Sequence, residues 1–174
     1  MKILGIESSC DETAVSLIEV KNKKVNIISH TIASQIKLHQ KFGGVVPELA
    51  ARHHLKNIIP TLQTSIKDPK DIDVIAVTQG PGLMTSLFVG LEAGKTLSFL
   101  WNKPLVTINH MQAHVYANWL ERSWSEIKFP AICLIASGGH TEVVLIKDEY
   151  NFKRLGQTVD DAGHLARRQH ARLG

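Results

Sequence analysis

The sequence has few cysteines, few aromatic residues and no long apolar run. Only Cys10 and Cys133 among its 174 residues are cysteine, and aromatic residues make up 6%. Two cysteines so far apart predict neither a disulfide framework nor a thiolate zinc site, which agrees with a reducing compartment. No run approaches the roughly 20 apolar residues of a membrane span, and the N-terminal apolar stretch is too short for a signal peptide. We therefore expect a cytoplasmic protein without a membrane segment.

Acidic residues are absent from the end of the sequence. All sixteen lie at or before Asp161, whereas Arg167, Arg168 and Arg172 follow it. Seventeen basic residues precede the last acid, so the formal net charge of +4 divides into +1 for that part and +3 for the rest. The total charge therefore gives no indication of a nucleic-acid partner.

Apolar runs separated by polar turns predict an α/β protein. An antiparallel meander opens the chain, and strands then alternate with helices, which favours a mixed sheet with flanking helices. Pro47 and Glu48 have the residue types that begin a helix. The expected elements are strands at 2–6, 13–20 and 25–33, a helix from Pro47, a strand at 73–78, a helix at 83–101, a strand at 104–108 and a helix at 110–121.

A second hairpin is predicted after Pro130, with strands at 131–136 and 141–146. It repeats the strand, polar turn and strand that open the chain. Two such hairpins facing each other across a cleft hold phosphates through backbone N–H groups in actin-like and sugar-kinase-like ATPases. We expect residues 1–129 to form a first domain and residues 130–162 to begin a second, incomplete one.

Histidines four residues apart, His110 and His114, give the strongest local indication of chemistry. On a helix this spacing places both imidazoles on one face, where they can share a metal ion. A pair of solvated or capping histidines is the alternative. Met111 follows His110 where a zinc protease of the His-Glu-x-x-His type needs its general base, so protease chemistry is not supported.

Two turns contain further candidate site residues. Ser137, Gly138, Gly139 and His140 combine flexible backbone with donors suited to a phosphate or carboxylate, although an ordinary hairpin turn would have the same composition. Asp11 and Glu12 occupy the opening turn, where carboxylates either orient a reacting group or are simply solvated.

Two other patterns receive structural interpretations. The stretch from Gly90 to Thr96 has three residues between its glycines, one fewer than a phosphate-binding loop requires, and lies within a predicted helix. Gly90 and Gly94 are instead expected to form a small face for close packing. His39, His53 and His54 are expected at the surface or at helix caps.

Several segments together resemble the TsaD family, also called Gcp or OSGEP, over Met1 to about Ala162. They occur in the family's order and spacing, so the resemblance is specific. The matching segments are Gly5-Ile6-Glu7-Ser8-Ser9-Cys10-Asp11-Glu12-Thr13, Ser34-Gln35 with His39, Gly43-Gly44-Val45-Val46-Pro47-Glu48, Gly80-Pro81-Gly82-Leu83, Asn109-His110-Met111 with His114, and Ser137-Gly138-Gly139-His140-Thr141.

The resemblance implies an actin-like (ASKHA, ribonuclease H-like) two-domain fold and a transferase. The family moves threonylcarbamoyl from threonylcarbamoyl-adenylate to N6 of the tRNA adenosine 3′ of the anticodon and releases AMP. Implied ligands are one divalent metal ion, iron or zinc, and an adenylate or ATP-type nucleotide. Implied partners are tRNA, TsaB- and TsaE-type proteins in a bacterial setting, and a second subunit in a homodimer or heterodimer.

Residue by residue, the resemblance implies metal binding by His110 and His114. It also implies adenylate binding by the loop Ala136, Ser137, Gly138, Gly139 and His140, and it leaves Asp11 and Glu12 as candidate catalytic residues. The alternatives are a non-catalytic partner subunit of the same complex, which we expect to lack the histidine pair, and an ASKHA-type kinase or ATPase.

The sequence departs from the family pattern after Ala162. Residues 163–174 form a basic, acid-free tail where the family continues with Ala-Gly-Glu-Ala-Phe-Asp-Lys and a further stretch about as long as this chain. The Asp of that pattern belongs to the substrate site, and a third metal ligand lies in the further stretch. Arg167 and Arg168 offer no acceptor to replace either. We interpret the tail as an altered reading frame or chain end, and we expect the chain alone to be inactive.

Overall fold

The structure is a computed structural model that describes residues 1–22, 24–120, 126–137 and 140–157. The chain divides into two compact units, Met1–Ser123 and Trp124–Gly174. The first unit thus ends upstream of the domain boundary expected after residue 129. The basic tail expected at 163–174 lies outside the described residues. No helix of the described residues has both the length and the apolarity that crossing a membrane requires.

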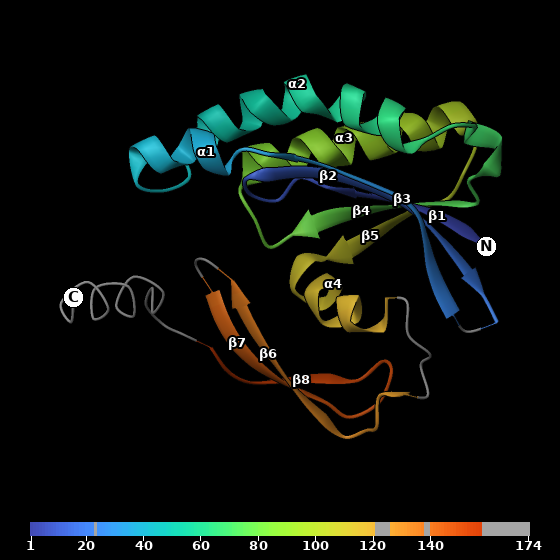
Figure 1. Cartoon of the computed structure of the whole chain (residues 1–174), viewed down its shortest axis with the longest axis vertical. Helices are drawn as coiled ribbons and strands as arrows, with labels where there is room; N and C mark the ends of the chain where they lie inside the picture. The colour runs from blue at the N-terminus through green and yellow to red at the C-terminus, as the bar shows by residue number, and fades with distance from the viewer. Residues whose placement is uncertain (23, 121–125, 138–139, 158–174) are drawn as a thin grey trace. The chain divides into compact units, whose positions relative to one another are not determined.

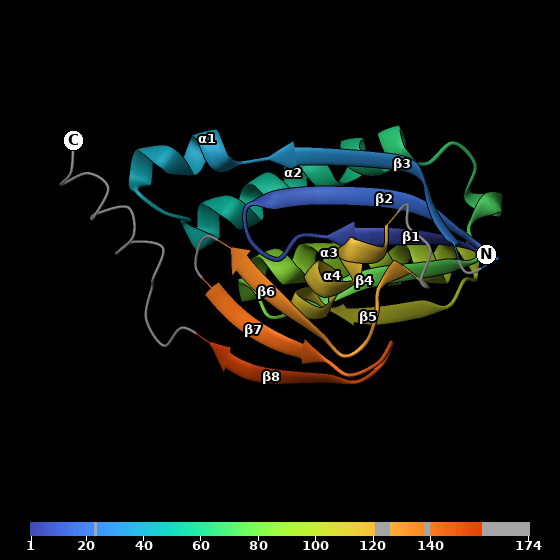
Figure 2. The ribbon, with the colours of Figure 1, turned by 60° about the horizontal axis from the view of Figure 1, so that its bottom comes forward.

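The elements follow the order that the sequence predicts, with short helices added at the connections (Figures 1 and 2). The first unit contains β1 (Lys2–Glu7), β2 (Glu12–Lys21), β3 (Lys24–Ser34), α1 (Ile36–His39), the 3₁₀ turn η1 (Gln40–Phe42), α2 (Pro47–Ser65), η2 (Pro69–Asp71), β4 (Val74–Gly80), α3 (Met84–Trp101), β5 (Leu105–Asn109), α4 (His110–Tyr116) and η3 (Ala117–Trp119). The second contains β6 (Ala131–Ser137), β7 (His140–Ile146) and β8 (Phe152–Gln157).

The first unit is built on a five-stranded mixed sheet with the order β3-β2-β1-β4-β5. Strand β2 is antiparallel to both of its neighbours, whereas β4 is parallel to β1 and to β5. Strands β1, β3, β4 and β5 therefore run in one direction, and their ends meet at one edge, called here the carboxyl edge. Ligands of open α/β sheets bind outside this edge, at the point where the strand order reverses.

Helices cover both faces of this sheet. Helices α2 and α3 lie side by side on one face and α4 lies on the other (Figures 1 and 2). The apolar side chains of alternate strand positions fill the layer between the sheet and α2 and α3, because successive side chains of a strand point to opposite faces. This core consists of Leu4, Ile6, Val15, Leu17, Ile58, Leu62, Ile72, Ile75 and Val77.

Gly90 brings α3 into close contact with the turn that follows β1. A Cβ at this position would lie 2.5 Å from the Ser8 hydroxyl oxygen. That buried hydroxyl accepts from the Gly90 N–H at 3.0 Å and donates to the Ser86 carbonyl at 2.8 Å. At Gly94, one turn later, a Cβ would meet Leu105 and Val77 at 3.4 Å. The small packing face expected for the two glycines is confirmed, and the stretch from Gly90 to Thr96 is helical, not a phosphate-binding loop.

Two buried histidines hold the turn between β1 and β2, contrary to the surface position expected for them. His54 of α2 is fully buried, with Nδ1 2.8 Å from the Thr13 hydroxyl and Nε2 3.1 Å from the Cys10 carbonyl oxygen. A carbonyl only accepts, so Nε2 donates to it and Nδ1 accepts from Thr13. Burial holds the pKa of His54 below its ordinary value. The ring is therefore a neutral clamp between α2 and the turn.

His39 forms a second clamp through Gln35. Its Nδ1 accepts from the Val46 N–H at 3.3 Å, so its Nε2 carries the proton and donates to the Gln35 side-chain oxygen at 3.2 Å. The Gln35 backbone N–H donates to the Asp11 carbonyl oxygen at 2.9 Å. Both residues are 3% exposed. The sequence pattern predicts a surface position for His39 because it indicates only which face of a helix a residue occupies. It does not reveal hydrogen bonds to residues outside that helix.

The second unit is a three-stranded antiparallel sheet with the order β6-β7-β8. The expected hairpin is present, and its strands extend by one residue each, so that Ser137 pairs with His140. Strand β8 was not expected from the sequence, because Phe152–Gln157 alternates apolar and polar residues only weakly. Ile132 and Leu134, 71% and 63% exposed, lie on the same face of β6.

Helix α4 is shorter than predicted. A helix was expected over 110–121, but α4 ends at Tyr116 and continues as the 3₁₀ turn η3. Leu120 is already extended, with φ −61° and ψ 132°. The Asn109 side chain caps the start of α4 by accepting from the N–H groups of Met111 and Gln112, so the predicted beginning of the helix is confirmed.

Replacing Gly90 with Ala is expected to lower the free energy of unfolding by about 2 kcal/mol, because the new Cβ displaces the Ser8 hydroxyl from two buried hydrogen bonds. Gly94→Ala is the matched control in the same helix. The Cβ added at Gly94 makes only ordinary van der Waals contacts, so we expect the free energy of unfolding to change by less than about 1 kcal/mol. Urea unfolding followed by circular dichroism measures both. Equal losses at the two positions would contradict the Ser8 contact.

Stability is expected to fall as pH drops below about 6.5, the ordinary pKa of histidine, because the unfolded chain then binds a proton that folded His54 resists. The contribution of His54 to the free energy of unfolding is complete above that pH and declines as the pH falls below it. His54→Gln, which does not titrate, should lose less stability between about pH 7.5 and about pH 5 in parallel urea titrations. His54→Phe should cost about 3 kcal/mol at neutral pH, because it leaves the Cys10 carbonyl and Thr13 hydroxyl unpaired. Identical pH slopes for wild type and His54→Gln would argue against the clamp.

Candidate functional site

Three neighbouring parallel strands each bring a polar side chain to the carboxyl edge. Glu7 is the last residue of β1, Thr78 lies two residues before the end of β4, and His110 directly follows β5. Because β1, β4 and β5 are consecutive in the sheet, these ends are adjacent even though they are far apart in sequence. His110 also begins α4, which places His114 one turn further along the same face.

The Glu7 carboxylate accepts hydrogen bonds from all sides of this cluster. One oxygen accepts from the Ser9 backbone N–H, and the other accepts from the Thr78 hydroxyl and from His110 Nδ1 at 3.1 Å. Burial by itself raises the pKa of Glu7, but the hydrogen bonds from His110, Ser9 and Thr78 outweigh burial and lower the pKa to about 2. Glu7 is therefore a fixed anion behind His110.

This anion fixes the tautomer of His110. An ionised carboxylate only accepts, so His110 Nδ1 carries a proton, and Nε2 is the ring nitrogen that faces His114. Nε2 of His110 lies 3.2 Å from Nε2 of His114, and the two rings meet nearly edge to face at 82°. Burial and the neighbouring His110 hold the pKa of His114 below its ordinary value.

Two imidazoles whose Nε2 atoms face each other at 3.2 Å are spaced as two ligands of one metal ion would be. Two nitrogens that bind one tetrahedral zinc at about 2.05 Å are about 3.3 Å apart. A carboxylate that accepts from the other ring nitrogen orients such ligands in many metal sites. His110 and His114 therefore fit two of the ligand positions around one metal ion. Within the described residues, no three His, Cys, Asp or Glu side chains are grouped to hold a metal, so a further protein ligand would come from outside this set.

The predicted catalytic pair, Asp11 and Glu12, forms no described hydrogen bond or ion pair with His110 or His114. Both residues belong to the turn held by His54 and His39, at the same edge as Glu7. Next to them, burial and the Asp11 charge raise the pKa of the Cys10 thiol to about 11, so Cys10 is not a thiolate nucleophile at neutral pH.

The predicted adenylate loop lies in the second unit, at the connection between β6 and β7. Ala136 is an exposed residue of β6, and Ser137 and His140 are the last pair of the ladder. Gly138 and Gly139 lie outside the described residues. The structure therefore places the loop at a tight hairpin end, and its ligand-binding role stays a prediction.

The roles of Glu7, Ser9 and Thr78 were not predicted from the sequence. A usable signal was present, since Glu7 directly follows the apolar run Ile3–Ile6 and Thr78 ends the apolar run that begins at Val74. Polar residues at the ends of buried parallel strands converge on one edge, but the neighbouring order of β1, β4 and β5 had to be known first.

Residues 26–173 match the family model described as TsaD, tRNA N6-adenosine threonylcarbamoyltransferase. The protein of that name from Thermomicrobium roseum is 49% identical over 181 residues, which cover 99% of this chain and 49% of the relative. The one from Staphylococcus saprophyticus is 51% identical over 164 residues, which cover 92% of this chain and 46% of the relative. The chain thus spans about half the length of the curated relatives it matches.

Solved structures are similar at the level of the fold. YeaZ from Pseudomonas aeruginosa aligns with a TM-score of 0.53 and 12% identity, over 92% of this chain and 66% of that chain. The type II variant of the Aquifex aeolicus Ppx/GppA phosphatase aligns with a TM-score of 0.50 and 13% identity, over 98% of this chain and 55% of that chain. These actin-like neighbours confirm the predicted fold class.

The family model and the curated relatives both agree with the resemblance that the sequence motifs indicate. The match reaches residue 173 and so includes most of the segment after Ala162, where the sequence leaves the quoted motif pattern. This chain belongs to the TsaD family of tRNA N6-adenosine threonylcarbamoyltransferases.

Proposed function

We propose that this chain supplies the metal-binding half of an enzyme that transfers threonylcarbamoyl from threonylcarbamoyl-adenylate to N6 of the tRNA adenosine 3′ of the anticodon, with release of AMP. The observation that carries the proposal is the pair of facing Nε2 atoms of His110 and His114, 3.2 Å apart, with Glu7 behind His110. A non-catalytic subunit of the same fold has no use for this arrangement.

His110 and His114 would hold one divalent ion, iron or zinc. When bound, such an ion would polarise the threonylcarbamoyl carbonyl and stabilise the negative charge that develops as the adenine amine attacks. Glu7 would keep a proton on His110 Nδ1 and so leave Nε2, which faces His114, as the nitrogen that binds the ion. Thr78 and Ser9 keep Glu7 ionised and in place.

The remaining predicted residues take positioning roles in this proposal. Asp11 and Glu12, on the turn clamped by His54 and His39, would orient the adenine amine and accept its proton. Ala136, Ser137, Gly138, Gly139 and His140 would bind the adenylate through backbone N–H groups at the hairpin end. The leaving group is AMP, so this loop would hold the phosphate that departs.

The chain alone is proposed to be inactive. Two histidines bind a metal weakly without further ligands, and an incomplete site does not exclude water from an activated adenylate. The complete reaction would take place in the cytoplasm, where tRNA is modified, together with TsaB- and TsaE-type partner proteins. We further propose that the chain pairs with a second subunit, as a heterodimer or a homodimer.

Replacing Glu7 with Gln is expected to weaken zinc binding about tenfold or more, because the ring loses the charged acceptor that orients it and raises its basicity. Zinc titrations followed by the ring NMR signals of His110 and His114 measure the affinity. Glu12→Gln is the matched control, since Glu12 forms no described hydrogen bond or ion pair with either histidine. An unchanged affinity in Glu7→Gln, with the fold intact by circular dichroism, would contradict the positioning role.

Transfer is tested by joining Met1–Gln157 of this chain to the second half of the Staphylococcus saprophyticus relative. With tRNA, partner proteins and threonylcarbamoyl-adenylate, the chimera should form threonylcarbamoyladenosine, detected by mass spectrometry of digested tRNA. The 174-residue chain alone should form none. His110→Ala and His114→Ala should each reduce transfer at least about 100-fold, as expected when a metal ligand is lost. Full activity of both variants would exclude the metal role.

A further inference from the structure

The segment between β3 and α2 combines positive charge with an exposed aromatic ring. Between Glu19 and Glu48 the sequence has no acidic residue and five lysines, of which only Lys37 and Lys41 lie in this segment. Lys37 lies in α1, and Lys41 and Phe42 lie in η1. Both lysines are exposed, and Phe42 is 60% exposed. The small net charge of the whole chain hides this local excess.

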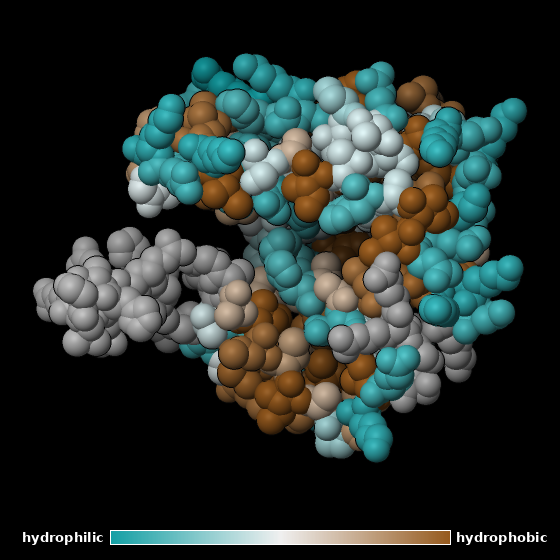
Figure 3. All heavy atoms as spheres, viewed as in Figure 1, coloured by the Kyte–Doolittle hydropathy of each residue, from teal (hydrophilic) through white to brown (hydrophobic). Residues whose placement is uncertain are grey.

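This segment projects from the carboxyl edge, beside the candidate site. Strand β3 ends at Ser34, which pairs with Glu12, and α1 begins two residues later. Figure 1 shows α1 at the end of the sheet toward which the arrows of β4 and β5 point. In Figure 3 the same end of the first unit is mostly hydrophilic, with hydrophobic side chains between. Glu48, the acid that ends the tract, is paired with Arg52 at 2.7 Å.

The segment is held firmly, although its outer face makes no described ion pair. His39 and Gln35, both 3% exposed, fix it from within through the Val46 N–H, the Ala50 carbonyl oxygen and the Asp11 carbonyl oxygen. After Phe42 the chain turns at Gly43, with φ +70°, and a Cβ added at Gly43 or Gly44 would meet no atom within 4 Å. An exposed aromatic ring on a firmly held backbone therefore lies next in sequence to open glycine backbone and near two lysines.

We propose that Lys37, Lys41 and Phe42 form a contact surface for an RNA strand, in which Phe42 stacks on an unpaired base and the two lysines bind phosphates. The proposal rests on the proposed function and deepens it, because an adenosine of the anticodon loop can reach the carboxyl edge only if flanking nucleotides lie against neighbouring surface. Loop bases that are not paired stack on aromatic side chains, and lysines bind the backbone beside them.

The test is binding of a fluorescently labelled anticodon stem-loop RNA to the 174-residue chain, measured by anisotropy at several salt concentrations between about 50 and 200 mM. Lys37→Gln with Lys41→Gln should reduce the slope of log affinity against log salt by about 1.5, because each lysine releases slightly under one counterion per phosphate. Phe42→Ala should weaken binding about tenfold and leave the slope unchanged, because stacking involves no counterion.

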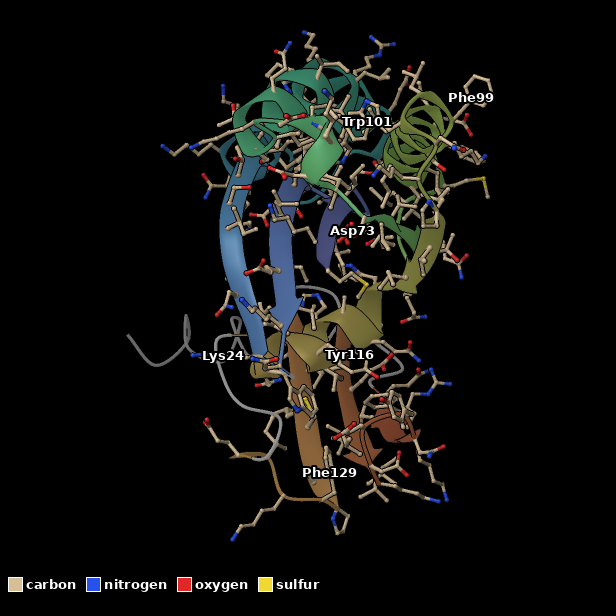
Figure 4. All side chains as sticks on the ribbon, turned by 90° about the vertical axis from the view of Figure 1, so that its right-hand side faces the viewer. Lys24, Asp73, Phe99, Trp101, Tyr116 and Phe129 are labelled. Carbon is tan, nitrogen blue, oxygen red and sulfur yellow. The ribbon has the colours of Figure 1, made fainter. Side chains whose placement is uncertain are left out.

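Matched controls lie at the opposite edge of the same sheet, which Figure 4 faces. Lys21→Gln with Lys24→Gln removes two lysines of the same acid-free tract from the other end of β3. Phe99→Ala removes a ring that is 87% exposed, near the end of α3, and Figure 4 shows it projecting outward. Neither control should change affinity more than about twofold or alter the slope by more than about 0.5. Phe42→Leu, which keeps an apolar side chain but no flat ring, should behave as Phe42→Ala.

Several results would overturn the proposal. These are undetectable binding of wild-type chain, controls that weaken binding as much as the site variants, an unchanged salt slope in the lysine variant, or full affinity of Phe42→Ala. The outcome is separable from that of the proposed function. If the chimeric enzyme with all three substitutions transfers threonylcarbamoyl normally, the RNA-binding surface is wrong but the proposed function stands. If RNA binding depends on the lysines but the chimera transfers nothing, the surface is supported and the proposed function is contradicted.

Discussion

The candidate site depends on one buried anion, the Glu7 carboxylate. It receives hydrogen bonds from its own turn at Ser9, from β4 at Thr78 and from the start of α4 at His110. Each donor offsets part of the cost of burying the charge, and their combined effect lowers the pKa of Glu7 to about 2 even though burial opposes ionisation. An apolar side chain here would leave the Ser9 N–H, the Thr78 hydroxyl and His110 Nδ1 without their common acceptor.

The Glu7 carboxylate also determines which ring nitrogen of His110 faces its neighbour His114. Because His110 Nδ1 donates to Glu7, Nε2 is the ring nitrogen that faces His114 Nε2. This pair of nitrogens, 3.2 Å apart, is the basis of the metal site proposed above. The packing of Gly90 on Ser8 serves the same site from behind, because it brings α3 against the turn that contains Ser9.

Buried histidines outside this centre give the adjoining turn its fixed geometry. His54 and His39 each have one nitrogen that must donate and one that must accept, so each is neutral and in a single tautomer. His54 bonds the Cys10 carbonyl oxygen, and His39 bonds Gln35, whose own backbone N–H donates to the Asp11 carbonyl oxygen. The turn with Asp11 and Glu12 and the projection with Phe42 are thus positioned by the same buried polar network.

The sequence by itself determined the order of the elements, the actin-like fold class and the pairing of His110 with His114. Periodicity and turn residues report contacts within a few residues, and the i, i+4 spacing is a property of the helix alone. Only the tertiary structure decided that Glu7 and Thr78 join His110, that His39 and His54 are buried, and that Asp11 and Glu12 form no described hydrogen bond or ion pair with the histidine pair. Those facts depend on which strands are neighbours and on hydrogen bonds between residues 44 and 103 positions apart, which local pattern does not encode.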